Sequence, residues 1–456
     1  YLHLPIKVSV SGKCNESEFH KKSIPFYKAG SIDIFLKHPY LWWPRGYGDQ
    51  NFYDVTITAY IGDQFVITKE FPMAIRTAEL DRTSLTDGVS GKFRFIINNE
   101  PIMCRGTNWV PLDAYHSRDY LRLEKALDMV FDIGCNIVRC WGGNVYESDA
   151  FYDYCDKKGI MVWQDFGMAC SVKCQREEFC RILESEATKV VHRLRLHPSI
   201  VLWSGDNECD SAYDAGLLDP TKNKLTRNVL AEVVRLNDPL RPYLPSSPCY
   251  DGIKPDGAEE KSETHLWGPR DYFKSSYYTN SKAHFVSEIG YHGFPNIESI
   301  KKFISNDQLW PNTETEEWIL HSADQKGNPY RMRLARDQIS QFFGAEPDDM
   351  ENFVKASQYT QAEAKKYFIE RIRCKKPIKT GVIWWNLLDG WPQVSDAVVD
   401  YYFSKKEAYD YIKRSQQEVV IMLDELNSNS CDIIAVNDII FNRAYKFKQI
   451  FWSEIL

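Results

Sequence analysis

A repeated alternation of short apolar runs with amphipathic segments constrains this chain more than any other feature. The apolar runs NIVRCW (residues 136–141) and IMVWQDF (160–166) enclose the amphipathic SDAFYDYCDKKG (148–159), and EEFCRILESEATKVVHRLRLH (177–197) then precedes SIVLWSG (199–205). Short apolar runs are typical of strands buried on both faces, and segments with a helical period are typical of the helices that cover them. The alternation therefore predicts parallel βα units.

The chain contains eight strand candidates of this kind. They lie at residues 102–106, 136–141, 160–166, 199–205, 241–248, 263–268, 283–290 and 380–390. The fifth and sixth are the weakest of the eight. Eight βα units predict a (β/α)8 TIM barrel, which we expect to occupy residues 78–414. The polar stretch 309–351 is expected to be an elaborated, irregular βα loop near the face that carries the active site.

Both flanking regions show the period-two alternation of β-strands. Residues 1–77 contain IKVSVSG, SIDIFLK, FYDVTITAYIG and QFVITKEFPM, separated by turn residues, and predict a small immunoglobulin-like β-sandwich. In residues 415–456, QEVVIMLDELN and CDIIAVND predict two more strands. Because so few residues remain there, we expect a partial β-sandwich module, so the fold class is multidomain.

Composition excludes several classes of partner. The formal net charge is −7, with acidic and basic residues interspersed, which disfavours a nucleic-acid or anionic membrane partner. The sequence has no apolar run of the length that spans a bilayer. Among 12 cysteines, Cys170, Cys174 and Cys180 lie closest together but lack a paired zinc-ligand spacing. We expect buried, inert thiols, no metal and no cofactor; oligomeric state and compartment do not follow from the sequence.

Two glutamates stand at the carboxyl ends of predicted strands. Glu208 follows the fourth strand and Glu288 ends the seventh. Side chains at carboxyl strand ends face the active site of a TIM barrel, and these two strands lie on opposite sides of its mouth. Two carboxylates that face each other suit glycosidic bond cleavage, which needs one proton donor and one nucleophile or base. On spacing alone, a salt-bridged or surface role is about equally good for each glutamate.

Six long strings extend over nearly the whole chain: LWWPRGYGDQ, RGTNWVPLDAY, IVRCWGGNVYESDAFYDYCDKKGIMVWQDF, HPSIVLWSGDNE, FVSEIGYHGFP and GVIWWNLLDGWP. In content and order they resemble glycoside hydrolase family 2, and within it the β-mannosidase branch. The resemblance implies that Glu208 is the acid/base, that Glu288 is the nucleophile, and that Asn207 hydrogen-bonds the sugar 2-hydroxyl. It implies a retaining exo-β-glycosidase acting on an oligosaccharide or glycoconjugate.

The branch assignment depends mainly on Trp141-Gly142-Gly143, because β-galactosidases and β-glucuronidases carry a different, histidine-containing string there. The resemblance places Trp141 in the mannose pocket and Trp385 at its floor. Core packing is the alternative for both rings. A sibling specificity (β-galactosidase, β-glucuronidase or exo-β-glucosaminidase) and an inactive carbohydrate-binding relative remain the alternative functions.

Four further residues are candidates for contact with the substrate. His265 and Trp267 end the sixth predicted strand, and a satisfied structural role is the alternative for the histidine. Trp109 and Asp113 follow the first strand and either line the site or brace the rim of the barrel.

The chain departs from the family pattern in two ways. Asp206 stands where the family usually has asparagine; since residues i and i+2 of a strand share a face, Asp206 could raise the pKa of Glu208, or it could pair with a cation or a backbone amide. The family also carries an amino-terminal jelly-roll domain whose loop helps to close the sugar pocket. We expect this chain to be truncated before its first sandwich, and also at its carboxyl terminus.

Overall fold

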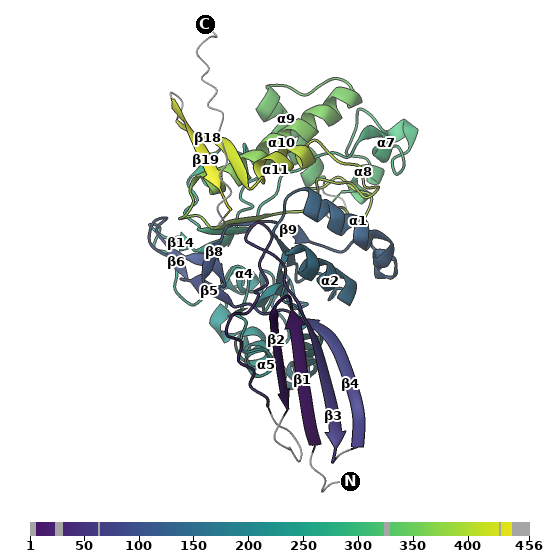
Figure 1. Cartoon of the computed structure of the whole chain (residues 1–456). Helices are drawn as coiled ribbons and strands as arrows, with labels where there is room; N and C mark the ends of the chain where they lie inside the picture. The colour runs from purple at the N-terminus through teal and green to yellow at the C-terminus, as the bar shows by residue number, and fades with distance from the viewer. Residues whose placement is uncertain (1–5, 23–30, 63, 323–328, 428–429, 440–456) are drawn as a thin grey trace, which may run out of the picture.

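The centre of the molecule is a curled sheet of eight parallel strands (Figure 1). The computed structural model describes residues 6–22, 31–62, 64–322, 329–427 and 430–439. The strands are β9 (Cys104–Trp109), β10 (Ile137–Cys140), β11 (Met161–Asp165), β12 (Ile200–Ser204), β13 (Tyr243–Leu244), β15 (Glu263–His265), β16 (Phe285–Glu288) and β17 (Gly381–Trp384). Their order is β13-β12-β11-β10-β9-β17-β16-β15, and all eight predicted strands are confirmed. With the helices around it, the sheet is the predicted TIM barrel.

The two weakest predicted strands are also the shortest strands of the barrel wall, and they form the two ends of the pairing order. Side chains connect these ends. Ser247, three residues beyond β13, donates from Oγ to Glu263 Oε1 of β15 at 2.8 Å. A polar contact therefore joins the barrel where the backbone ladder of the described residues stops.

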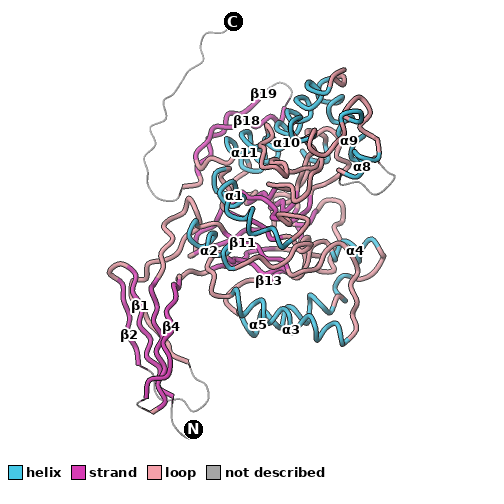
Figure 2. The backbone as a smooth tube through the Cα atoms, turned by 90° about the vertical axis from the view of Figure 1, so that its right-hand side faces the viewer, coloured by secondary structure: helices cyan, strands magenta, loops and turns pink. Residues whose placement is uncertain are grey.

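Helices cover the outside of the sheet, as the amphipathic segments predict (Figure 2). They are α1 (Asp119–Asp132), α2 (Asp149–Lys158), α3 (Glu177–Leu194), α4 (Cys209–Ala215), α5 (Ala231–Asn237), α6 (Ser276–Thr279), α7 (Ile297–Ile300), α8 (Glu316–Leu320), α9 (Tyr330–Phe343), α10 (Met350–Cys374) and α11 (Ala408–Ser415). In α3 the buried residues include Leu183, Ala187, Val190 and Leu194, spaced by three or four. Helix α2 ends at Gly159, whose φ of 68° suits a residue without Cβ.

A small antiparallel sheet closes the amino-terminal end of the barrel. It consists of β5 (Ala78–Arg82), β7 (Phe93–Ile97) and β8 (Glu100–Ile102), and the turn between β7 and β8 uses two asparagines with positive φ. Phe93 and Phe95 of β7 are fully buried and pack their rings against Trp163 and Phe285 inside the barrel. The hairpin before the first barrel strand is therefore a plug for the barrel.

The amino-terminal region contains a four-stranded antiparallel sheet that projects from the barrel (Figures 1 and 2). Its order is β2 (Ser17–Lys22), β1 (Ile6–Cys14), β3 (Tyr53–Ile61) and β4 (Gln64–Met73). The prediction of a strand at SIDIFLK is wrong: residues 31–37 form no strand, although Ile32 and Leu36 pack against the apolar cluster of the sheet. The alternation there reflects one-sided burial without a backbone ladder. A complete sandwich stays a prediction.

The expected elaborated loop at residues 309–351 is not irregular throughout, because about half of its residues are helical. It contains α8, α9 and the start of α10. Met332, Ala335 and Ile339 of α9 pack with Trp318 of α8 in a separate apolar cluster, which explains why helices form in this polar stretch.

The carboxyl-terminal region contributes the hairpin of β18 (Val419–Asn427) and β19 (Ser430–Asn437), as predicted, and residues 440–456 lie outside the described residues. Strands β6 (Leu85–Thr86) and β14 (Glu260–Lys261) form a two-stranded bridge. Within the described residues, no helix is long and apolar enough to cross a bilayer.

Replacing Phe95 with alanine should destabilise the protein by about 3 to 5 kcal/mol, because the change leaves a cavity in the plug. Phe65 on β4 is 58% exposed, so Phe65→Ala should change stability by no more than about 0.5 kcal/mol. Urea denaturation followed by circular dichroism measures both variants. Equal effects would show that the plug does not support the barrel.

Candidate active site

A cavity of about 560 Å³ opens at the carboxyl ends of the barrel strands. Of the residues predicted from the sequence, seven line it: Asp113, Trp141, Asn207, Glu208, Trp267, Glu288 and Trp385. They come from the first, second, fourth, sixth, seventh and eighth strands or from the segments that follow them. The barrel thus gathers in one place residues that are up to 272 positions apart, from Asp113 to Trp385.

Glu288 ends β16 and is held by two hydrogen-bond donors. Arg139 donates from Nη1 to Glu288 Oε1 at 2.6 Å, and Trp267 donates from Nε1 to Oε2 at 2.9 Å. The side chain is only 4% exposed. Hydrogen-bond donors on both oxygens suit an ionised carboxylate, because neither Arg139 nor Trp267 can accept a hydrogen bond from a protonated carboxyl group.

Glu208 lies between β12 and helix α4 and is more accessible, with 29% of its side chain exposed. Its φ of 55° is in the left-handed region, which is uncommon for a residue with a side chain and marks a constrained position. Backbone bonds fix this turn: Asn207 N donates to Met168 O at 3.0 Å, and Glu208 N donates to Ser247 O at 2.9 Å. The turn directs the Glu208 carboxylate into the cavity.

His265 bridges the two glutamates. Its Nδ1 lies 2.7 Å from Glu208 Oε1 and 3.4 Å from Glu288 Oε2. One oxygen of Glu208, one oxygen of Glu288 and a ring nitrogen of His265 all lie within 4.8 Å of one another. His265 is 4% exposed and lies outside the set of cavity-lining residues, so its place is behind the two carboxylates and not in the predicted sugar pocket.

The two members of the Glu208–His265 pair are shifted in opposite directions. Burial acts to raise the pKa of Glu208, but the hydrogen bond and charge of His265, with Cys170 and Arg139, lower it overall. Burial acts to lower the pKa of His265, but the charge of Glu288 and the bond to Glu208 raise it. Both shifts have the same meaning: the pair favours the ion-paired form, with Glu208 ionised and His265 protonated.

Arg139, from β10, is the centre of the polar core. It is fully buried and donates to Glu288 Oε1, to Asn108 Oδ1 at 3.0 Å, to Asp165 Oδ2 at 2.8 Å and to Asn207 Oδ1 at 2.7 Å. Burial raises the pKa of Asp165 to about 6, although the charge of Arg139 acts in the opposite direction. One guanidinium therefore orients Glu288 and Asn207 together.

The glycines of the Trp141-Gly142-Gly143 string have a packing role. A Cβ on Gly142 would lie 2.4 Å from Met168 O and 3.1 Å from Asn207 N, and a Cβ on Gly143 would lie 2.1 Å from the Trp141 ring. The absence of a side chain at Gly142 thus lets the Asn207 backbone lie close to it, and the absence of one at Gly143 lets the Trp141 indole pack against the main chain. The Trp141 ring meets Trp385 edge to face, with centroids 5.3 Å apart, and Trp385 meets Trp267 at 6.0 Å.

The two alternatives, lining the site or bracing the rim of the barrel, have different outcomes for Trp109 and Asp113. Trp109 is the last residue of β9, is 2% exposed, donates from Nε1 to Glu147 Oε1 at 2.8 Å and lies outside the cavity lining. It braces the rim. Asp113 lines the cavity while Oδ2 accepts from Tyr401 Oη at 2.8 Å.

Of the two alternatives for Asp206, the structure favours the bond to a backbone amide, and Asp206 is not among the main causes that shift the pKa of Glu208. Asp206 Oδ1 accepts from Ser246 Oγ at 2.5 Å and from the backbone amide of Cys209 at 3.2 Å. The strand ends at Ser204, so the left-handed turn at Glu208 breaks the alternation on which the expectation depended. Burial raises the pKa of Asp206 itself to about 7.

Several cavity residues were not predicted from the sequence. Cys170 and Cys174 are exposed, so the expectation of buried thiols is wrong for both, and Cys170 Sγ lies 3.5 Å from Glu208 Oε2. Arg270 stacks on the Trp267 ring at 4.2 Å and lies 3.4 Å from Asp396 Oδ2. Arg139, which is fully buried behind the cavity lining and contacts Glu288, was also missed, although a charged residue inside an apolar strand is a usable signal.

Two groups of side chains in the described residues have the spacing of metal ligands. In the first, Glu208, His265 and Glu288, both Glu288 oxygens already accept hydrogen bonds, and the Arg139 charge opposes a cation.

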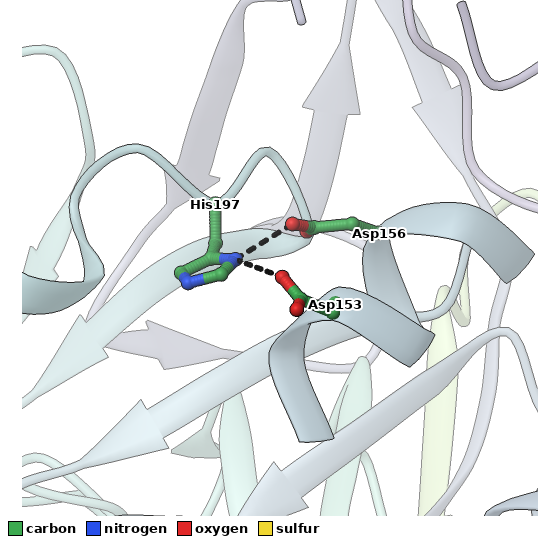
Figure 3. Close-up of side chains that lie close together, drawn as sticks. All are labelled: Asp153, Asp156 and His197. Atoms are coloured by element: carbon green, nitrogen blue, oxygen red, sulfur yellow. Dashed lines mark hydrogen bonds and ion pairs between the residues drawn. The ribbon is translucent and has the colours of Figure 1, made fainter. Parts of the chain in front are cut away.

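In the second group, His197 Nδ1 lies 2.7 Å from Asp156 Oδ2 and 4.0 Å from Asp153 Oδ1 (Figure 3). Asp156 Oδ1 also accepts from the backbone amide of Ser199 at 3.0 Å. These bonds attach α2 to the segment before β12, at the opposite end of the barrel from the cavity.

Comparison with known proteins agrees with this geometry. Residues 89–243 match the family model described as glycosyl hydrolases family 2, TIM barrel domain. β-Mannosidase B of Thermothelomyces thermophilus is 31% identical over 421 residues, covering 86% of this chain and 48% of that protein. β-Mannosidase of Capra hircus is 31% identical over 402 residues, covering 79% of this chain and 44% of that protein.

A solved structure also matches closely. The crystal structure of β-D-mannosidase from Dictyoglomus thermophilum has a TM-score of 0.84 at 32% identity, covering 95% of this chain and 54% of that one. The chain thus spans about half the length of the relatives that it matches. It belongs to glycoside hydrolase family 2. Within the family, the two relatives and the solved structure described above are named as β-mannosidases.

The raised pKa of Asp206 predicts a dependence of stability on pH. From about pH 4 to 7 the folded chain holds a proton that the unfolded chain has lost, so ionising Asp206 increasingly destabilises the fold as pH rises. Asp206→Asn cannot ionise. Its free energy of unfolding relative to the unmodified protein should increase by roughly 2 to 4 kcal/mol between pH 4 and 8. Urea titrations at several pH values measure this, and a constant difference would contradict it.

Proposed function

We propose that this chain is the catalytic core of a retaining exo-β-glycosidase, a β-mannosidase that hydrolyses terminal, non-reducing β-D-mannose residues by double displacement. The observation that carries the proposal is the spacing of the two carboxylates in the cavity, with oxygens within 4.8 Å. Retaining glycosidases hold their carboxyl groups about 5 to 5.5 Å apart, whereas inverting enzymes need about 6.5 to 9.5 Å to admit a water molecule.

The environments of the glutamates support different roles. Glu288 is enclosed and accepts two hydrogen bonds from donors, which suits a nucleophile that stays ionised and attacks the anomeric carbon. Glu208 is the more exposed carboxylate and has a histidine as partner, which suits a group that exchanges protons. In the first step Glu208 protonates the leaving oxygen as Glu288 bonds to the sugar. In the second, Glu208 removes a proton from water, and the water oxygen displaces Glu288.

The surrounding residues support sugar binding in the same cavity. Asn207 Oδ1 accepts a hydrogen bond from Arg139, so Asn207 Nδ2 is the group that can donate to a sugar hydroxyl. Cys170 Sγ lies 3.3 Å from Nδ2. The aromatic rings of Trp141, Trp385 and Trp267 provide faces and edges for the apolar side of a sugar.

The choice of mannoside is supported by the relatives, whose names state β-mannosidase, and by the Trp141-Gly142-Gly143 string. The exo character, the glycosidic substrate and the role of Asn207 depend on the family resemblance. The proposed substrate is an oligosaccharide or glycoconjugate with a terminal mannose.

Hydrolysis of a panel of 4-nitrophenyl glycosides tests the proposal. The β-mannoside should be cleaved fastest, and NMR should detect β-mannose as the first-formed anomer because two inversions restore the configuration. Faster cleavage of a β-galactoside, β-glucuronide or β-glucosaminide would assign a sibling specificity. First-formed α-mannose would overturn the double displacement, and sugar binding without turnover would indicate an inactive relative.

Substitution of the glutamates separates their roles. Glu288→Ala should reduce kcat for every substrate by roughly 10⁴-fold or more, because it removes the nucleophile. Glu208→Ala should reduce kcat/KM by roughly 10²- to 10⁴-fold for an alkyl β-mannoside but much less for a 2,4-dinitrophenyl β-mannoside, whose leaving group needs no proton. Steady-state kinetics with both substrates measures this. Equal losses in Glu208→Ala would contradict its role as acid.

A further inference from the structure

A third glutamate, Glu263, is buried behind the active site and has no role in the proposed displacement. It starts strand β15, two residues before His265, and is 4% exposed. Its Oε1 accepts from Ser247 Oγ at 2.8 Å and from Ser287 Oγ, while Oε2 has no hydrogen-bond partner in the described part of the chain. Burial of a carboxyl group is costly, so its presence here calls for a physical reason.

Glu263 is connected to the acid/base through a chain of hydrogen bonds. His265 Nε2 lies 3.1 Å from Ser247 Oγ, and His265 Nδ1 lies 2.7 Å from Glu208 Oε1. The order is therefore Glu263, Ser247, His265, Glu208. The same Glu263 oxygen also meets Ser287, the neighbour of Glu288.

The chain has a direction, because a serine hydroxyl has one hydrogen. An ionised Glu263 accepts only, so the Ser247 hydrogen points to Glu263 and Ser247 Oγ must accept from His265 Nε2–H. With Nε2 protonated, a neutral His265 has a bare Nδ1. Two bare acceptors 2.7 Å apart would repel, so one proton must lie between His265 Nδ1 and Glu208 Oε1.

Charges on every side of the imidazole favour a proton there. Glu208 precedes α4, Glu288 ends β16, and Glu263 Oε1 lies 4.0 Å from Nε2 on β15 itself. Arg139 of β10 is the opposing cation. Glu288 and Glu208 outweigh burial and raise the pKa of His265, and Glu263 places a third carboxylate 4.0 Å from the ring.

We propose that Glu263, acting through Ser247, is a positioning residue that fixes His265 with Nε2 protonated and thereby keeps the general-acid proton between His265 and Glu208. In the first step this proton moves from the Glu208 carboxyl group to the leaving oxygen, which keeps the electron pair of the broken C1–O bond. In the second step the attacking water returns a proton to Glu208. The catalytic consequence rests on the proposed function, whereas the placement of hydrogens does not.

¹⁵N NMR of the histidine side chains in the folded protein tests the placement without any substrate, with His265→Gln used to assign the signal. The unmodified protein should show His265 protonated at Nε2. At a pH where the imidazole is neutral, Ser247→Ala removes the acceptor of Nε2–H and should shift His265 toward the Nδ1–H tautomer. Glu263→Gln removes the buried charge and should lower the pH at which the imidazolium loses its proton.

Asp206→Asn is the matched control for the NMR experiment. It also converts a buried, serine-bonded carboxylate to an amide, but its partner is Ser246, so the His265 signals should not change. Thermal melting checks that each variant is folded; if Glu263→Gln does not fold, Ser247→Ala alone decides. A His265 tautomer unchanged in Ser247→Ala, or an unchanged titration in folded Glu263→Gln, would overturn the proposal.

Kinetics then test the consequence for catalysis. In Glu263→Gln the basic limb of kcat/KM should move to lower pH. Near pH 8, cleavage of the alkyl β-mannoside should fall at least about tenfold, with a loss below about threefold for the 2,4-dinitrophenyl β-mannoside. An equal loss for both substrates would refute the link to the acid proton. If no glycoside is hydrolysed at all, the proposed function fails, and the NMR result still stands by itself.

Discussion

The buried guanidinium of Arg139 is the interaction on which the rest of the cavity depends. Its hydrogen bonds reach β9, β11, β16 and the segment after β12, so one side chain connects five parts of the barrel. A planar fork with fixed donor directions is suited to this, and a lysine could not reproduce it. Removing one partner of such a buried pair typically costs about 3 to 5 kcal/mol, because the remaining charge loses its compensation.

The same interaction determines where charge is tolerated. Arg139 compensates Asp165 and Glu288 directly, but Glu208 and Glu263 face His265 instead. Carboxylates outnumber fixed cations around the two proposed catalytic residues, so protons must reside within this group of side chains. Burial, with a smaller contribution from the charge of Glu288, raises the pKa of Asp165 to about 6 even beside an arginine, and Glu208 and His265 shift as a pair through their hydrogen bond.

Much of the barrel could be predicted from the sequence because most of its strands, such as β10, β11, β12 and β17, are buried along their whole length and are mainly apolar. Even the weak fifth and sixth strands lie where they were expected, at residues 243–244 and 263–265. The run SIDIFLK was wrongly predicted as a strand, because a segment with one buried side shows the same alternation of apolar and polar residues as a strand in a hydrogen-bonded sheet. The insertion at 309–351 misled because its helices pack on one another, so polar residues cover most of its surface.

Within the site, what could be predicted was the position of residues along strands. Glu208 and Glu288 face one cavity because strand ends meet at one rim. The direction of each side chain beyond the last regular strand residue could not be predicted, since it depends on local turns. The left-handed turn at Glu208 turns Asp206 toward Ser246, and β15 places His265 behind the carboxylates. Hydrogen-bond chains such as that from Glu263 join strands distant in sequence and leave no periodic signal.

The aromatic plug formed by Phe93 and Phe95 has a consequence for how substrate, product and water enter and leave the barrel. Because rings fill the amino-terminal end, molecules exchange with the cavity through its carboxyl-terminal mouth. In a double displacement, the alcohol that leaves and the water that enters would then pass through this mouth one after the other. The residence time of the alcohol at the mouth would then set the lifetime of the covalent intermediate. A second sugar bound there could react in place of water, with one of its hydroxyl groups as the acceptor.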